Sequence, residues 1–367
     1  SKIDCLPMSR VRARLIGWGK YLPEQIMTNQ DILETCGTID AATGERVFNY
    51  YGAAGEVLKS KPITAEDIVK TTGIEQRRRA AEDESSEDMA IEAAGRALAH
   101  AGLPEDTEWR GIFVHCVHRR LHYPSAAQRI QHRYGLRVVD GYAEDCSSAC
   151  GGYVQQVQKM ADLMQVRPGA YLVVGADCMS RITPPDDINH VLFGDAAGAT
   201  VWVPSEPGQP GAIATTRSTV VTRGVNGDVN PIDFIYENER GQMLMPYGPL
   251  VVKWVRKHVF KLMEALLEQA GWREGPPLVV VLHQANINVL KFFPGLLARV
   301  YDGDVRVYTG ITNIGNASSG STAYGYAACL DAVDDGSGDT IRIRPGDRVL
   351  LVAFGSGMNI HGIAIQH

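Results

Sequence analysis

The chain has little excess charge of either sign and no long hydrophobic run. Lys and Arg number 36 against 42 Asp and Glu, a formal net charge of -6, which excludes the strong basic field of a nucleic-acid-binding protein. No apolar run approaches the roughly 20 residues that a membrane-spanning helix needs, and the first residues lack the apolar stretch of a signal peptide. We therefore expect no nucleic-acid partner, no membrane insertion and a cytoplasmic location.

Cysteine is also sparse, and no metal or cofactor motif is evident. The 7 cysteines are an odd number, without the density of a disulfide scaffold or the paired spacing of a zinc site. His118 and His122 would share a helical face as metal ligands, but the intervening Arg119 and Arg120 oppose a cation there. The glycine motifs lack a Gly-x-Gly-x-x-Gly run after a first strand, as nicotinamide and flavin sites require. We expect neither metal nor cofactor.

The chain does contain alternating strand and helix patterns. Helices are predicted at 86–101 and 251–270, because both segments have helical apolar spacing and end at a glycine. Short runs rich in Val, Leu and Ile predict buried strands at 11–17, 111–117, 170–175, 278–282 and 348–354. The alternation predicts an α/β protein.

An internal repeat indicates two related halves. A helical pattern at 151–165 leads into Arg-Pro-Gly and a strand, and a second at 319–333 leads into another Arg-Pro-Gly and strand. Each unit then ends in a glycine-rich apolar hairpin, at 192–201 and 353–362. Self-similarity in a fixed order indicates architecture more strongly than any single propensity.

The boundaries of these halves follow from turn-rich segments. We place the N-terminal half at 11–205 and the C-terminal half at 206–367, joined by the Pro- and Gly-rich segment 204–211. Residues 35–66 do not fit the alternation of strands and helices, and their sequence predicts an irregular insertion with one short helix. It either covers a substrate channel or decorates the surface. Residues 334–339 read as a polar loop.

Cys150 is the candidate nucleophile. It lies in a run of small residues directly before a predicted helix, where the helix N-terminus is expected to lower the pKa of the thiol. The alternative is a packed core cysteine, which is how we interpret Cys146.

His283 and Asn316 are the candidate partners. His283 follows a strand, where α/β sheets place catalytic groups, although a lone histidine there is more often structural. Asn316 opens the second repeated helix much as Cys150 opens the first, although asparagine there is most often a cap. The repeat predicts that both helix starts face one central site.

Residue for residue, this set resembles the Cys-His-Asn triad of the β-ketoacyl-acyl-carrier-protein synthase III family of thiolase-fold condensing enzymes. The resemblance covers nearly the whole chain, through Leu15-Ile-Gly-Trp-Gly-Lys-Tyr-Leu-Pro-Glu, Thr72-Gly-Ile-Glu-Gln-Arg-Arg, His122-Tyr-Pro-Ser-Ala-Ala, Phe193-Gly-Asp-Ala-Ala-Gly-Ala, His283-Gln-Ala-Asn, Gly315-Asn-Ala-Ser and Ala353-Phe-Gly-Ser-Gly. It implies a five-layered αβαβα thiolase-like fold of two pseudo-symmetric halves that acts as a homodimer.

The resemblance also implies a two-step reaction. Cys150 takes an acyl group from a coenzyme A or acyl-carrier-protein thioester, and the backbone N–H groups of Cys150 and Ser356 form the oxyanion hole. His283 and Asn316 then stabilise the enolate of a malonyl-type thioester that loses carbon dioxide, which gives a β-ketoacyl product. Met358 stands near the place where a thiolase would carry a second cysteine, so decarboxylative condensation fits best.

Substrate contacts are implied less directly. Tyr123 would come from the partner subunit to close the acyl pocket, and Gln284 and Asn286 follow the catalytic histidine as substrate-binding residues. Arg119 or Arg120 is expected either to pair with a substrate carboxylate or phosphate, or to belong to a solvated interface stretch.

The sequence departs from the family at the coenzyme A site. Asp67 and Thr71 stand where primer-type members carry a tryptophan and an arginine for the adenine ring, and Asn288 replaces an arginine expected to meet the carrier protein, with Lys291 the nearest cation. These departures favour polyketide or other specialised metabolism over housekeeping fatty-acid initiation. Two alternatives stay open: an acyltransferase with a hydroxyl or amine acceptor, and a non-catalytic partner that binds carrier proteins.

Overall fold

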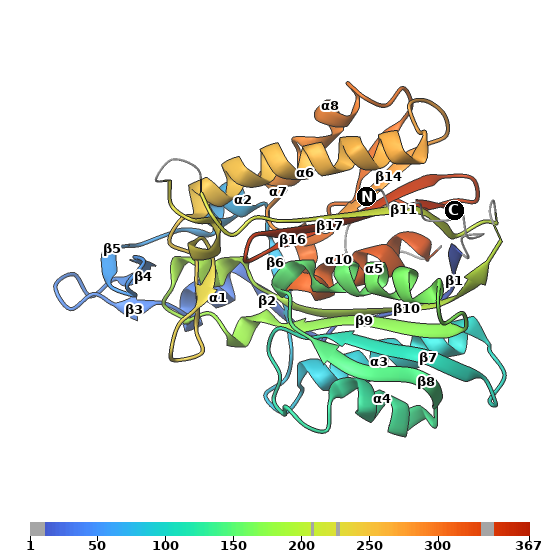
Figure 1. Ribbon diagram of the computed structural model, residues 1–367. Coiled ribbons are helices and arrows are strands. Elements are labelled where there is room, and N and C mark those ends of the chain that lie inside the picture. The colour runs from blue at the N-terminus through green and yellow to red at the C-terminus, as the bar shows by residue number, and fades with distance from the viewer. Residues whose placement is uncertain (1–11, 207–208, 225–227, 332–340) are drawn as a thin grey trace.

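Helices and strands are stacked in five alternating layers (Figure 1). The computed structural model describes residues 12–206, 209–224, 228–331 and 341–367. The helices that form the layers are α3 (Ser86–Ala101) and α4 (Ala126–Tyr134) on one outer face, α5 (Gly152–Met164) and α10 (Ser318–Leu330) in the centre, and α6 (Gly248–Ala270) on the other outer face. The expected αβαβα thiolase-like fold is confirmed.

The strands between these helices form one 10-stranded sheet in the order β15-β14-β16-β17-β11-β1-β10-β9-β7-β8. In chain order they are β1 (Arg12–Tyr21), β7 (Glu108–His115), β8 (Arg137–Cys146), β9 (Ala170–Cys178), β10 (Asp195–Ser205), β11 (Ala212–Val220), β14 (Leu278–Leu282), β15 (Val305–Val307), β16 (Arg348–Gly355) and β17 (Asn359–Gln366). All five predicted strands are among them.

The sheet is two copies of one topology joined edge to edge. In each copy the first strand pairs antiparallel with the fifth, the fifth antiparallel with the fourth, and the fourth, second and third are parallel. The copies meet at one described residue pair, Arg14 and Ala212. This pseudo-symmetry brings α5 and α10, each 13 residues long, side by side in the central layer. The exact assignment of the halves to 11–205 and 206–367 stays a prediction.

Local sequence explains where the outer helices begin and end. The Ser85 side chain accepts a hydrogen bond from the N–H of Asp88 and the Asp88 carboxylate accepts one from the N–H of Ser85, a capping box that starts α3. Gly102 ends it in the left-handed conformation. Alanines with no exposed surface form the inner face of α3, where short side chains let the helix pack closely on β1 and β10.

The insertion at 35–66 is a small antiparallel sheet that projects from the body in Figure 1. It consists of β3 (Thr38–Ile39), β4 (Arg46–Tyr51) and β5 (Val57–Lys61), so the helix predicted within it is wrong. β4 buries Val47 and Phe48, and the Nζ of Lys59 lies 4.3 Å above the Tyr50 ring on the neighbouring strand. Aromatic and β-branched residues in β4 stabilise a pleated pair here more than a helix.

The remaining elements are short. They are β2 (Gln25–Thr28), α1 (Asn29–Thr35), α2 (Ala65–Thr72), β6 (Gln76–Arg79), β12 (Tyr236–Glu237), β13 (Met243–Leu244), α7 (Ile287–Leu290), α8 (Phe293–Leu297) and α9 (Ile311–Ile314). Among the described helices, none combines the length and the apolar character needed to cross a bilayer. The polar loop predicted at 334–339 lies outside the described residues.

Candidate active site

Cys150 lies at the start of the central helix α5, as the sequence predicts. It is the middle residue of a short 3-10 turn, Ala149–Gly151, that leads directly into the helix. Ala149 has a φ of 46°, an uncommon left-handed conformation for a residue with a side chain. The turn is held from the other half of the molecule by Gly355, where an added Cβ would lie 2.8 Å from the backbone nitrogens of Cys150 and Gly151. Only glycine allows this close approach between the two loops.

The thiol of Cys150 has a raised pKa, so the expected lowering is wrong. Burial raises the pKa to about 11, and the carboxylate of Asp177 adds to the effect, while the Ser318 side chain and the Cys150 N–H act in the opposite direction. The cost of removing a thiolate from water therefore exceeds the stabilisation from the helix start. Cys150 rests as a neutral thiol.

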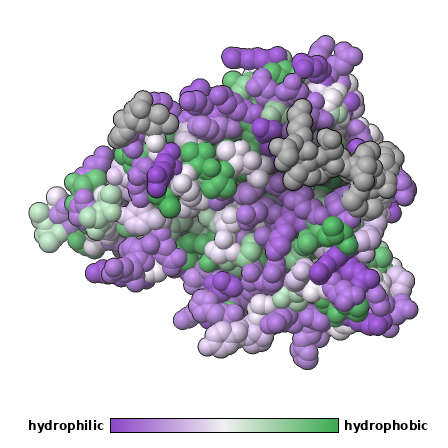
Figure 2. Space-filling view, in the orientation of Figure 1, coloured by the Kyte–Doolittle hydropathy of each residue, from purple (hydrophilic) through white to green (hydrophobic). Residues whose placement is uncertain are grey.

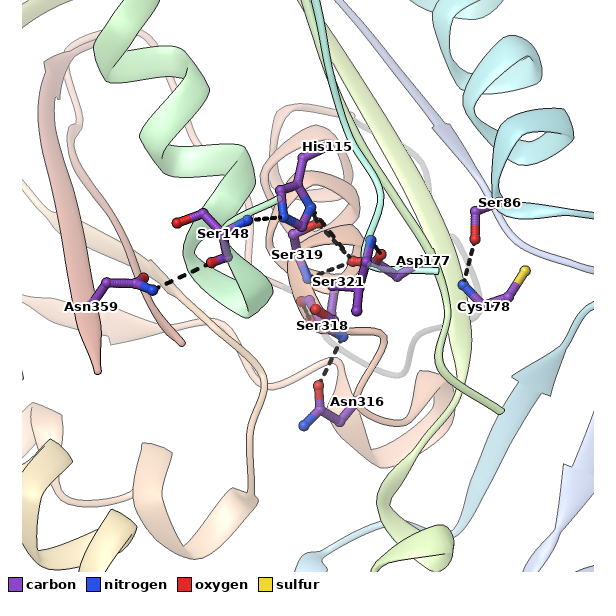
Figure 3. A network of polar contacts seen from close by, with 11 residues as sticks. Ser86, His115, Ser148, Asp177, Cys178, Asn316, Ser318, Ser319, Ser321 and Asn359 are labelled. Atoms are coloured by element: carbon purple, nitrogen blue, oxygen red, sulfur yellow. Dashed lines mark hydrogen bonds and ion pairs between the residues drawn. The ribbon is translucent and has the colours of Figure 1, made fainter. Parts of the chain in front are cut away.

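Asn316 is held in place by its main chain and by its side-chain oxygen. Its main chain is held by Leu192 and Gly194, with the Asn316 N–H 2.9 Å from the Leu192 carbonyl and the Gly194 N–H 3.1 Å from the Asn316 carbonyl. Its Oδ1 accepts the N–H of Ser318 at 2.9 Å (Figure 3). Because the oxygen is used within the turn, the side chain presents a hydrogen-bond donor.

His283 is a neutral, buried imidazole at the carboxyl end of β14. The backbone N–H of His283 donates to the Val352 carbonyl at 2.9 Å, and the imidazole ring meets the Phe354 ring edge-on at 5.1 Å between centroids. Burial lowers the pKa of His283 to about 3, against the opposite effect of a hydrogen bond to the backbone of Ser318. At neutral pH the ring is an uncharged hydrogen-bonding group.

Ser318 is the residue that links the three predicted side chains. Its N–H donates to Asn316, its backbone interacts with the His283 ring, and its hydroxyl is close enough to lower the pKa of Cys150. The hydroxyl oxygen is buried and has no well-aligned hydrogen-bond partner within the described parts of the chain. The structure therefore brings Cys150, His283 and Asn316 together around the start of α10.

A cavity of about 180 Å³ opens beside Cys150. Its lining combines apolar and polar side chains: Val117, His118, Ser147, Ala149, Met179, Ile182, Ile235, Tyr236, Glu237, Gly241, Met243, Ser318 and Ser356 accompany Cys150. The volume and mixed lining suit a small organic group attached to the sulfur. His283 and Asn316 are not among the residues that line this cavity. Both contact Ser318, which does line it.

Ser356 is among the residues that line the cavity beside Cys150. It follows Gly355 in the loop that packs against the Cys150 turn. Its carbonyl accepts the Nδ2–H of Asn359 at 2.6 Å, and its hydroxyl donates to the Ile235 carbonyl. These contacts use the carbonyl and the side chain of Ser356 and fix the loop on both sides. The part of its backbone N–H in the oxyanion hole stays a prediction.

The predicted substrate residues Arg119, Arg120 and Tyr123 lie on the segment between β7 and α4. Arg119 is 3.4 Å from a carboxylate oxygen of Asp145, which also accepts the first N–H groups of α4. Arg120 donates to the Asp83 carbonyl at 3.0 Å. Tyr123 is 85% exposed. In this chain both arginines thus pair with protein groups, and Tyr123 is available to a second molecule.

Gln284 and Asn286 hold the backbone around His283. The Gln284 amide donates to the carbonyls of Leu282 and Tyr308 and accepts the Ile311 N–H at 3.1 Å. Asn286 caps α7 and donates to the Thr71 carbonyl at 2.9 Å. Both side chains therefore bind backbone groups and hold neighbouring loops in place. That they also contact the substrate stays a prediction.

Sequence reasoning did not single out Ser318 or His115. Ser318 is one of several serines in a small-residue run, and no local signal distinguishes it. His115 begins the histidine-rich segment 115–123, but its contacts lie on distant elements. In the described residues, no group of three or more His, Cys, Asp or Glu side chains could hold a metal ion.

Comparison with known proteins places this geometry in a family. The family model for 3-oxoacyl-[acyl-carrier-protein] synthase III matches residues 144–219, and the model for its C-terminal part matches 267–367. β-Ketoacyl-[acyl-carrier-protein] synthase III of Listeria monocytogenes is 31% identical over 362 residues, covering 97% of this chain and 99% of the relative.

Solved structures agree with the sequence comparison. The 3-oxoacyl-(acyl carrier protein) synthase III of Pseudomonas aeruginosa PAO1 has a TM-score of 0.73 at 25% identity, covering 97% of this chain and 98% of that one. The priming β-ketosynthase of the R1128 polyketide pathway shares the fold, with a TM-score of 0.76 at 24% identity over 99% of this chain and 98% of that one. The chain belongs to the β-ketoacyl-[acyl-carrier-protein] synthase III family of condensing enzymes.

Proposed function

We propose that this protein forms a carbon–carbon bond between an acyl group held on Cys150 and a malonyl-type thioester that loses carbon dioxide. The observation that carries the proposal is the arrangement of Cys150, His283 and Asn316 around Ser318, with a small cavity beside the sulfur. Both half-reactions need groups of the types found there.

In the first half-reaction, Cys150 exchanges its proton for an acyl group. The sulfur attacks the thioester carbonyl, the tetrahedral oxyanion accepts the N–H groups of Cys150 and Ser356, and the C–S bond to the donor breaks. The departing thiolate takes up the proton that Cys150 gives away, so the raised pKa of Cys150 is no obstacle once donor and nucleophile exchange the proton directly. The acyl group is then seated in the cavity.

In the second half-reaction, the malonyl-type thioester loses its carboxylate as carbon dioxide. The electron pair left behind forms an enolate, whose oxygen accepts hydrogen bonds from the His283 ring and the Asn316 amide. A neutral imidazole and an amide oriented by Ser318 stabilise this negative charge without reorganising. The carbanion attacks the acyl carbonyl, and the C–S bond to Cys150 breaks with its electron pair left on the sulfur. The thiolate takes up a proton from solvent water to restore the resting thiol, and a β-ketoacyl thioester leaves.

The proposal includes coenzyme A or acyl-carrier-protein thioesters as substrates, no dedicated cofactor, and a homodimer in which Tyr123 reaches the partner's site. The departures at Asp67 and Thr71 support a role in specialised metabolism such as polyketide starter formation. Both residues lie on α2, where the Thr71 hydroxyl donates to the Asp67 carbonyl at 2.7 Å, and neither offers a large flat side chain to stack on adenine.

Transfer of the acyl group to a hydroxyl or amine is the second candidate, and one observation favours it. His118 lines the same cavity as Cys150, and burial together with Arg181 lowers the pKa of its ring. A neutral imidazole at this place could take the proton from an O–H or N–H acceptor.

Release of carbon dioxide distinguishes the two reactions, because only the condensation releases it from the malonyl group. Protein acylated with unlabelled acetyl-coenzyme A is mixed with malonyl-coenzyme A carrying carbon-14 in its free carboxylate. Condensation releases one labelled carbon dioxide for each acyl group consumed, whereas retention of the label while alcohols or amines discharge Cys150 supports acyl transfer. A protein that is never acylated by any thioester would be a non-catalytic partner.

A further inference from the structure

His115 is a fully buried imidazole at the end of β7, outside the set of residues that the proposed reaction uses. Both ring nitrogens have partners. Nε2 accepts the backbone N–H of Ser148 at 3.0 Å, and Nδ1 lies 2.7 Å from the Ser319 hydroxyl (Figure 3). Ser148 precedes Cys150 by two residues, and Ser319 belongs to the helix that Asn316 opens.

These contacts fix the protonation of the ring. Because Ser148 donates to Nε2, the ring proton is on Nδ1 and is donated to the Ser319 oxygen. The Ser319 hydroxyl is then left to donate to Asp177, and its oxygen lies 2.7 Å from that carboxylate. Asp177 also accepts the N–H groups of Ser319 and Val117. Burial lowers the pKa of His115 to about 3, so the ring is neutral and its 3.9 Å approach to Asp177 is not an ion pair.

The start of α5 is shaped to receive this ring. A side chain at Gly152, the first residue of the helix, would overlap the His115 imidazole. The ring therefore occupies the space directly under the turn that carries Cys150. It connects that turn to α10 and β9, which come from different halves of the chain.

The other side of Ser148 is also held. Its carbonyl accepts the Asn359 side chain at 3.5 Å, and the same Asn359 nitrogen donates to the Ser356 carbonyl at 2.6 Å. The Ser148 peptide thus lies between His115 and a residue that also fixes the Ser356 loop. Cys150 and Ser356 carry the two N–H groups assigned to the oxyanion.

We infer that His115 is a positioning residue for acylation: by accepting the Ser148 N–H, it holds the Cys150 turn so that the Cys150 N–H is aimed at the oxyanion. Ala149 in this turn has a strained, positive φ, and such a conformation persists only where surrounding contacts impose it. The hydrogen bond between Ser148 and His115 is one such contact. The inference rests on the proposed function, because it assigns the ring a part in forming the acyl-enzyme.

Two conservative variants separate the two contacts of the ring. In His115→Gln, the Oε1 atom reaches about as far as Nε2 and can still accept the Ser148 N–H. In His115→Asn, the shorter amide can still donate to Ser319 but cannot reach Ser148. Both replace an aromatic ring by an amide of lower volume, so they are matched in polarity.

Two reactions of Cys150 are compared in each variant by intact-protein mass spectrometry. Acylation by acetyl-coenzyme A passes through an oxyanion, whereas alkylation by iodoacetamide displaces iodide and forms none. We expect His115→Asn to slow acylation by up to about 100-fold, the loss that a misplacement of about 1 Å can cause, with alkylation unchanged. We expect His115→Gln to acylate close to the parent rate.

Equal acylation rates in the two variants, or parallel losses of acylation and alkylation, would overturn the inference. If neither variant folds, Ser319→Ala replaces them. It removes the Nδ1 partner and loosens the ring, so acylation should fall while alkylation stays at the parent rate, and parallel behaviour again contradicts the inference. A parent protein that alkylates at Cys150 but accepts no acyl group would contradict the proposed function itself, and the inference with it.

Discussion

Cys150 and Asn316 occupy matching positions in the two halves of the fold: each lies two residues before a 13-residue helix in the central layer. The same topology therefore delivers a sulfur from one half and an amide donor from the other. Ser318, the first residue of α10, touches both. This arrangement divides the site into a nucleophile and a group that stabilises charge, and the two can be tested separately.

Asn316→Ala should leave acylation of Cys150 intact and slow decarboxylation. Removal of one oriented donor to a developing oxyanion typically costs about 100- to 1,000-fold in rate, and we expect a loss in that range. Release of labelled carbon dioxide from malonyl-coenzyme A by the acylated protein measures it. The matched control is Asn288→Ala on α7, whose amide donates to the backbone of α2 and which is not among the residues that line the cavity beside Cys150. Equal decarboxylation in the two variants would contradict the role of Asn316.

His283 should stay neutral throughout the working pH range. Burial lowers its pKa to about 3, so the uncharged form prevails at every pH well above that value. In protein with ¹⁵N-labelled histidine rings, the signals assigned by their loss in His283→Gln should not move between pH 8 and pH 5. A titration of these signals near pH 6.5 would show that the imidazole is charged when carbon dioxide is released.

Alkylation of Cys150 should accelerate with pH well beyond neutrality. Because burial raises its pKa to about 11, the thiolate fraction grows about tenfold for each pH unit below that value. Peptide mapping after timed exposure to iodoacetamide gives the rate at Cys150 apart from those of the other cysteines. A rate that levels off between pH 7 and pH 8 would mean that the helix start dominates over burial.

Gly355→Ala should impair acylation. The new Cβ would lie 2.8 Å from the backbone nitrogens of Cys150 and Gly151, so the Ser356 loop and the Cys150 turn must move apart. A displacement of about 1 Å in such a site can cost about 100-fold in rate. Gly295→Ala is the control, because a Cβ added there meets no described atom within 4 Å apart from its chain neighbours and the backbone of its own helix. If Gly355→Ala is acylated at the parent rate, the Ser356 N–H does not stabilise the oxyanion.

Much of the fold was predictable because its core elements are long and locally consistent. The helix at 86–101 has its cap, its apolar spacing and its terminal glycine in one segment, and the structure gives it the same bounds. The sheet in the insertion was not predictable to the same degree. β3 to β5 are short strands between glycines, and pairing across strands stabilises them more than any local pattern does.

The residues of the candidate site were predictable from the sequence, but the pKa of the nucleophile was not. Resemblance pointed to Cys150, His283 and Asn316, and the structure brings them together. The pKa of Cys150 could not be read from its place before a helix, since the depth of burial depends on the loops that cover it. The contacts of His115 could not be predicted either, because its partners Ser148 and Ser319 are 33 and 204 residues away in the chain.

Intact-protein mass spectrometry tests the central claim most directly. The parent protein, Cys150→Ala and the matched control Cys146→Ala are each incubated with acetyl-, butyryl- and octanoyl-coenzyme A and weighed before and after treatment with neutral hydroxylamine, which cleaves thioesters. We predict that the parent and Cys146→Ala gain one acyl group that hydroxylamine removes, and that Cys150→Ala gains none. Acylation of Cys150→Ala to the parent extent would contradict the account.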